Sequence, residues 1–191
     1  MSNTLPILTG LGDTASYTEN AAAVVLDTNG DASVSDAELN NFPSFAGAAL
    51  TLARHGGSNA DDVFSGNGTA VGKLDLTHSN GLGENVSLDG GASFIGTFSQ
   101  PGDGTFTVTF NSNASHANVN AVLQQISYAN TNDNPPASVT IDFTFSDGNG
   151  PGGQDQGSGA MPGTTTANVT VNITSTDDAP TMVNVAPSGP T

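Results

Sequence analysis

Cysteine and tryptophan are absent from this chain of 191 residues, and its only lysine and arginine are Lys73 and Arg54. Without cysteine the chain can form no disulfide, no thiol nucleophile and no thiolate metal site. The scarcity of cations excludes nucleic acid as a ligand, because binding phosphates requires clustered lysine and arginine. No apolar run of about 20 residues is present, so the sequence predicts no membrane insertion.

Acidic residues are abundant by contrast. The chain carries 18 aspartate and glutamate residues, and its formal net charge is −16. A compact fold with so many unpaired carboxylates repels itself unless cations neutralise part of the charge. We expect Ca²⁺ as the cofactor, because calcium takes oxygen ligands only and accepts irregular geometry. The alternative is a surface that is simply very soluble or adapted to high salt.

Short segments of β-branched and aromatic residues, separated by Gly, Asn, Ser, Thr and Asp, predict many short strands joined by turns. In residues 138–146, apolar and polar side chains alternate as in a half-buried strand, and residues 166–174 repeat this pattern. Residues 48–53 are a further expected strand. Residues 93–98 and 105–110 flank a strong turn signal, so we expect them to form a hairpin.

One segment breaks the strand pattern. Residues 115–128 follow helical spacing, and Ser115 is positioned to cap the N-terminus of this helix. We therefore expect an all-β fold, a β-sandwich of roughly seven to nine strands with one short helix and long glycine-rich loops.

The ends of the sequence read as linkers. We expect an N-terminal linker over residues 1–12, one β-sandwich domain over 13–176 and a C-terminal linker over 177–191. The N-terminus lacks a basic region followed by an apolar stretch, so no signal peptide is predicted. We expect the chain to be a piece of a larger protein whose export is directed from elsewhere.

Several motifs occur in a characteristic order. They are LTGLG (8–12) with YTEN (17–20), GAALTLAR (47–54) with NADDVF (59–64), LQQISYAN (123–130), PPASV (135–139), FSDG (145–148) and DDAP (177–180). In order and spacing these motifs resemble the cadherin-like repeats of giant repeats-in-toxin adhesins of Gram-negative bacteria. The resemblance covers roughly residues 5–181.

This resemblance implies a calcium-dependent, cadherin-like or immunoglobulin-like sandwich in an extracellular adhesin at the cell surface. One module of such adhesins captures the C-terminal carboxylate of partner peptides with the help of calcium, which attaches the cell to other cells or surfaces, as in biofilms. Other modules are extenders that calcium stiffens. The extra loops here favour the binding module. Its expected partners are a protein C-terminus on a host or neighbouring cell and the adjoining adhesin domains, and we expect a monomer. A lectin is a further alternative.

The most specific local motif is the sequence DTNGDASVSDAE. Oxygen-bearing side chains stand at positions 1, 3, 5, 7, 9 and 12 of an EF-hand-like calcium loop; they are Asp27, Asn29, Asp31, Ser33, Ser35 and Glu38. Position 6 is Ala32 instead of the usual glycine, and a predicted strand precedes the loop. A second interpretation, implied by the resemblance, places Asp27 at a strand end and Asp36 in a site at the sandwich edge. The motif is also simply a good turn.

Other acids are candidate calcium ligands. Glu19, Asp177 and Asp178 resemble the ligands of a cadherin-type junction between domains. Asp61 and Asp62 are adjacent carboxylates that a cation could bridge, although two solvated acids in a loop explain them equally well.

Residues 147–163 form the best candidate ligand-binding loop, because seven of the 17 residues are glycine and expose backbone groups to a ligand. Oxygen ligands for a calcium ion come from Asp147, Asn149, Asp155 and Gln156, and Ser158 adds a hydroxyl. Open positions on the ion would take a peptide's terminal carboxylate, supported by glycine N–H groups. Disorder is the alternative.

We expect no enzyme activity. His55, His78 and His116 are scattered without metal-site spacing, and no nucleophile elbow follows a strand.

Overall fold

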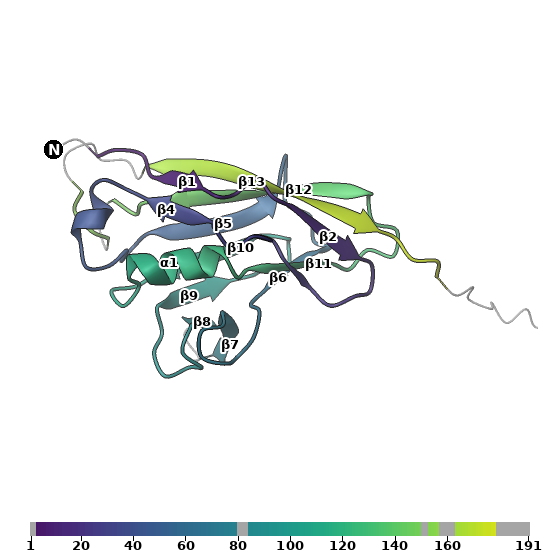
Figure 1. Cartoon of the computed structure of the whole chain (residues 1–191), viewed down its shortest axis with the longest axis horizontal. Helices are drawn as coiled ribbons and strands as arrows, with labels where there is room; N and C mark the ends of the chain where they lie inside the picture. The colour runs from purple at the N-terminus through teal and green to yellow at the C-terminus, as the bar shows by residue number, and fades with distance from the viewer. Residues whose placement is uncertain (1–2, 80–83, 150–152, 157–162, 179–191) are drawn as a thin grey trace, which may run out of the picture.

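The computed structural model describes residues 3–79, 84–149, 153–156 and 163–178 (Figure 1). Within them strands are the main regular structure, with one α-helix, α1 (His116–Leu123), and a single 3-10 turn, η1 (Leu39–Asn41). The prediction of an all-β fold with one short helix is confirmed. No helix in this described part is long and apolar enough to cross a membrane. The described residues form thirteen strands, more than expected, because several have only two to four residues and carry no alternating pattern.

The largest sheet has eight strands in the order β2-β13-β12-β5-β10-β9-β8-β7. Their bounds are Thr14–Thr18 (β2), Thr164–Thr174 (β13), Ser138–Ser146 (β12), Ala49–Arg54 (β5), Phe106–Phe110 (β10), Gly96–Ser99 (β9), Glu84–Ser87 (β8) and Asp75–Ser79 (β7). Neighbouring strands are antiparallel except β2 and β13, which are parallel. The predicted β9–β10 hairpin is confirmed, and apolar residues of β12 are buried at alternate positions as expected.

A three-stranded sheet in the order β3-β11-β6 is formed by Val24–Val25, Ser127–Asn130 and Asp62–Ser65. Its side chains meet those of the large sheet in the core. The Phe64 ring lies 6.0 Å from Phe106, and Tyr17 lies 6.0 Å from Tyr128. The two sheets therefore face one another across a shared core.

A third, two-stranded sheet pairs β1 (Ile7–Thr9) with β4 (Ser33–Ser35) in antiparallel register. Strand β1 falls inside residues 1–12, the segment predicted to be a linker. Its backbone pairing ties this segment to the loop region that precedes β5.

The helix prediction over 115–128 is correct at its start and wrong at its end. The Ser115 hydroxyl accepts a hydrogen bond from the Asn118 amide at 3.3 Å, as an N-cap does. Helix α1 ends at Leu123, and residues 127–130 form β11 between β3 and β6. The pairing of β11 on both sides outweighs the local helical spacing.

Two ends of the molecule concern function. At the first, called the Asp147 end, β12 finishes and β13 begins, next to residues 3–6 and 36–47. At the second, called the Glu19 end, β2 and β13 finish and the chain continues to Asp177 and Asp178 (Figure 1).

Candidate functional site

Asp147 organises the Asp147 end. Its side chain is fully buried and accepts the Gly163 amide on both oxygens at 2.9 Å. The Asn149 amide donates to Oδ1 at 3.0 Å, and Asn3 Nδ2 donates to Oδ2 at 2.7 Å. Gln156 Nε2 donates to the Asp147 carbonyl at 2.9 Å. The carboxylate thus fixes where the glycine-rich loop leaves and re-enters the sheet.

Asp36 is the second buried carboxylate at this end. It is 2% exposed, and its Oδ1 accepts the amides of Glu38 at 3.0 Å and Leu39 at 2.7 Å. Within the described residues, Oδ2 is buried and has no hydrogen-bond partner. Burial raises the pKa of Asp36, and the negative charges of Glu38 and Asp147 raise it further. A buried acid in this state calls for a proton or a cation.

Two amide side chains lie beside Asp147, those of Asn149 and Gln156. Gln156 is 3% exposed, and its Oε1 is buried without a partner in the described part of the molecule. The Asn149 Oδ1 accepts the Gln156 amide at 3.2 Å. Both residues, predicted as ligand-binding, are therefore buried supports of the loop.

Of the other predicted ligand-binding residues, Asp155 is exposed, and Ser158 lies outside the described residues.

Glu38 closes the Asp147 end from outside. Its Oε2 accepts the Thr4 hydroxyl at 2.6 Å and the Thr4 amide at 3.2 Å. These hydrogen bonds lower the pKa of Glu38. Glu38, which was predicted as a calcium ligand, is thus exposed and binds the N-terminal segment through Thr4.

The donor set at the Asp147 end fits calcium better than other metals. No group of three or more His, Cys, Asp or Glu side chains comes together as a metal site within the described residues. The hydrogen bonds on Asp147 already fill its carboxylate, so a cation here would take the unpartnered Asp36 oxygen together with amide and backbone carbonyl oxygens. Calcium accepts such mixed oxygen ligands, whereas zinc prefers nitrogen and sulfur.

The EF-hand-like motif is divided in the structure. Strand β4 separates Asp27, Asn29 and Asp31 from Asp36 and Glu38, and three strand residues span about 10 Å. Among the described residues, the acids of the motif do not come together as a metal site. The second interpretation, in which Asp36 belongs to a separate edge site, stays a prediction.

The Asp27 turn is held by its own carboxylate. Asp27 is 3% exposed and accepts the amides of Gly30 at 3.0 Å and Ala32 at 2.8 Å. Asp13, which the sequence reasoning missed, accepts the Thr28 hydroxyl and amide, both at 2.8 Å. These bonds lower the pKa of Asp13. No spacing signal links residue 13 to residue 28, so only the fold reveals the contact.

At the Glu19 end, Glu19 contacts the residue before Asp177 and Asp178, but these three predicted junction acids do not form a metal site within the described residues. Glu19 is 3% exposed, and its Oε2 accepts the Thr176 amide at 2.8 Å. Among the described residues its Oε1 is buried without a partner. Asp177 and Asp178 follow directly and are exposed. A carboxylate oxygen and two solvent-facing acids are therefore neighbours where the chain leaves the sheet.

Asp62 belongs to an ion pair. Arg54 donates to it twice, from Nε at 2.9 Å and from Nη2 at 2.6 Å, and the carboxylate is 2% exposed. The Tyr128 hydroxyl at 2.7 Å and Asn130 Nδ2 at 2.9 Å complete its partners. The pair raises the pKa of Arg54, while burial and then Asp62 raise that of Tyr128. These four donor hydrogen bonds leave the carboxylate little capacity for a metal ion.

Asp61 points to a different partner. Its Oδ2 accepts Asn132 Nδ2 at 2.8 Å, and the adjacent acids thus do not share one site.

The three histidines each have a separate partner. His55 Nδ1 lies 2.9 Å from Asp142, His78 Nε2 lies 3.0 Å from Asp75, and His116 Nε2 lies 2.7 Å from the Val34 carbonyl.

Comparison with known proteins adds no relative to this picture. A scan against protein-family models, a search of curated proteins and a search of solved structures each found no match to the chain.

Proposed function

We propose that this chain is a calcium-dependent, non-catalytic ligand-binding module, with a cadherin-like sandwich, of a large bacterial surface adhesin. It would act outside the cell and bind the C-terminus of a partner peptide or protein. The observation that carries the proposal is the buried Asp36 carboxylate, one oxygen of which has no partner within the described residues. Asp147 lies near enough for its negative charge to raise the pKa of Asp36.

The charge balance supports a metal ion at this end. Arg54 is engaged by Asp62, and Lys73 is exposed on a distant loop, so neither cation neutralises Asp36. Calcium would supply the missing positive charge. Asp36 Oδ2 and Gln156 Oε1 are the oxygens best able to contact it, and Asp147 adds a second negative charge.

The ligand class follows from the same chemistry. A calcium ion held by a few protein oxygens keeps positions for water, and a terminal carboxylate can replace water there. Backbone N–H groups of a glycine-rich loop can assist in holding an anion.

Short peptides with a free or an amidated C-terminus test this function by calorimetric titration, with calcium and with excess EDTA. We expect saturable binding only for free C-termini and only with calcium. Asp36→Asn should abolish binding, whereas Glu84→Gln, which removes the same charge at the exposed first residue of β8, should not. Equal binding of amidated peptides would contradict carboxylate capture.

A structural extender is the second candidate, and Glu19 is the observation that favours it. Its unpartnered Oε1 next to Asp177 and Asp178 suits a calcium ion shared with a following domain. If neither peptide form binds while calcium still raises the melting temperature of the wild type but not of Glu19→Gln, the extender role is favoured.

A further inference from the structure

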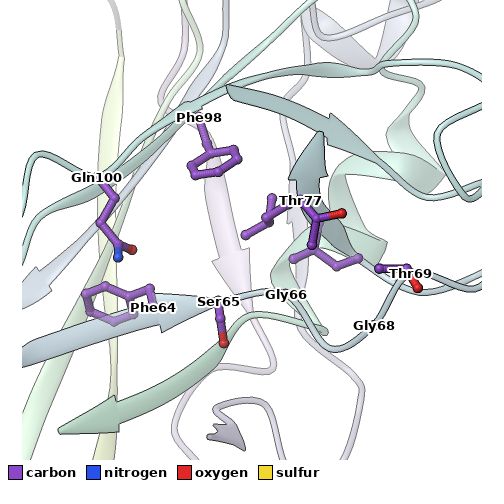
Figure 2. A pocket seen from close by; sticks show the side chains of 10 residues that line it. Phe64, Ser65, Gly66, Gly68, Thr69, Thr77, Phe98 and Gln100 are labelled. Atoms are coloured by element: carbon purple, nitrogen blue, oxygen red, sulfur yellow. The ribbon is translucent and has the colours of Figure 1, made fainter. Parts of the chain in front are cut away.

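A pocket of about 270 Å³ opens away from both ends of the molecule (Figure 2). Apolar side chains of β6, β7, β9 and the loop before β7 line it: Phe64, Leu74, Leu76 and Phe98. None of its lining residues belongs to the Asp147 or the Glu19 end. The pocket is therefore independent of the calcium proposal.

The pocket is uncharged although the chain has a net charge of −16. Its polar lining consists of hydroxyl groups and one carboxamide, that of Gln100. Figure 2 shows Gln100 and Phe64 on one side of the opening, with Thr69 and Thr77 across from them. A charged headgroup or a free carboxylate would find no counter-charge here, so a neutral ligand is required.

Gln100 carries an unused hydrogen-bond acceptor. Its Oε1 is buried and, within the described residues, has no partner. A buried acceptor left in this state is destabilising, and a donor on the ligand would relieve that cost. The ligand therefore needs an apolar body together with an N–H or O–H group.

Two sheet edges border the pocket. Strand β6 is the last strand of the three-stranded sheet, and β7 is the last strand of the eight-stranded sheet. Both contribute lining residues, Phe64 and Ser65 from β6 and Leu76 and Thr77 from β7. An extended peptide can pair with a free edge and insert a side chain into a neighbouring pocket.

We propose that this pocket receives a tyrosine or tryptophan side chain of a partner protein. A cavity of about 150 Å³ accepts benzene, so the larger pocket has room for a phenol or an indole. The Phe64 and Phe98 rings supply aromatic contacts, and the ligand hydroxyl or indole N–H donates to Gln100 Oε1. A sugar fits less well, because it needs partners for several hydroxyls and the Thr77 hydroxyl already donates to Asp75 at 2.7 Å.

Titration of the calcium-loaded protein with N-acetyl-tryptophanamide, N-acetyl-tyrosinamide and N-acetyl-phenylalaninamide, followed by NMR, tests the proposal. Saturable shifts should centre on the Gln100 side-chain amide and the backbone amides of Gly66 and Gly68. Phenylalaninamide, which lacks a donor on its side chain, should bind roughly two- to tenfold more weakly than tyrosinamide.

Variants separate the acceptor from general packing. Gln100→Leu should remove the preference for tyrosine over phenylalanine, whereas Thr97→Ala, at an exposed position of β9 just before Gln100, should keep it. Asp36→Asn should leave these titrations unchanged, which separates this proposal from the calcium-dependent function. Tighter binding of methyl hexosides than of tyrosinamide, or no saturable shift because the pocket holds only water, would overturn the proposal.

Discussion

Removing the guanidinium of Arg54 is the sharpest test of how this acidic fold is held together. In the wild type, Asp62 is buried and doubly hydrogen-bonded by Arg54, whose side chain is only 20% exposed. Arg54→Ala leaves this carboxylate with the Tyr128 hydroxyl and Asn130 amide as its side-chain partners. An uncompensated charge then remains in the core between the two sheets.

Breaking a buried ion pair from one side costs about 3–5 kcal/mol. Because Arg54 keeps some solvent contact, we expect the lower value, about 3 kcal/mol. For a chain of this size each kcal/mol lowers the melting temperature by roughly 2–4 °C, so a loss of about 6–12 °C follows.

Urea unfolding followed by circular dichroism measures this loss, with Lys73→Ala as the matched control. Both substitutions change the net charge by the same amount, but Lys73 is exposed, so its removal should change stability by less than about 0.5 kcal/mol. Equal effects of the two variants would refute the argument, since overall charge would then account for both. A loss that calcium fully restores would instead make Asp62 a metal ligand.

Three further outcomes follow from the structure. Burial raises the pKa of Asp36, so its contribution to stability is present at low pH and lost as pH rises through that raised pKa. In EDTA at pH 7, Asp36→Asn should therefore raise the melting temperature by roughly 2–4 °C. Thermal scans at pH 4 should show no gain for this variant. Hydrogen bonds from the Ser93 hydroxyl and amide and from Ser87 lower the pKa of Asp89 to about 2, so its contribution to stability is present above pH 4 and lost as pH falls toward 2. Acid titration over that window should therefore show a smaller loss of stability for Asp89→Asn than for the wild type. Identical profiles of the two proteins would contradict the assignment. Gly148 has φ 70°, and a β-carbon there would overlap the Gly47 carbonyl. Gly148→Ala should therefore lower the free energy of unfolding, measured in urea, by at least about 2 kcal/mol. Gly102→Ala should cost clearly less, because Gly102 has φ 87° but open space around it.

The long amphipathic strands were readable from the sequence because their pattern is local. Ser138–Ser146 alternates apolar and polar residues without interruption, and the structure gives those bounds. Ser115 likewise marks the start of α1, since an N-cap acts on residues immediately after it. Such features require only neighbouring residues to be known.

Short strands depend on distant partners instead. Ser127–Asn130 follows a helical pattern, yet its backbone pairs with β3 on one side and with β6 on the other. Strand β1 has three residues and forms only because β4 lies beside it. No local pattern of length three could have identified it.

The candidate sites divide in the same way. The sequence identified Asp147 because it opens a glycine-rich loop with several oxygen donors, whereas Asp36 and Glu19 were identified through the resemblance to cadherin-like repeats. It could not indicate that Arg54 forms an ion pair with Asp62, or that Asp13 accepts a hydrogen bond from the turn after Asp27. Those pairings arise from strands that meet only in the folded chain.

Calcium titration of thermal unfolding at pH 7, comparing the wild type with Asp36→Asn, is the decisive experiment for a calcium site at the Asp147 end. When free calcium is about 100 times its dissociation constant, binding to the native state adds about 2.7 kcal/mol, or roughly 5–11 °C for a chain of this size. We expect this rise in the wild type and its loss in Asp36→Asn. A flat wild-type response, or an undiminished rise in Asp36→Asn, would contradict a calcium site at the Asp147 end.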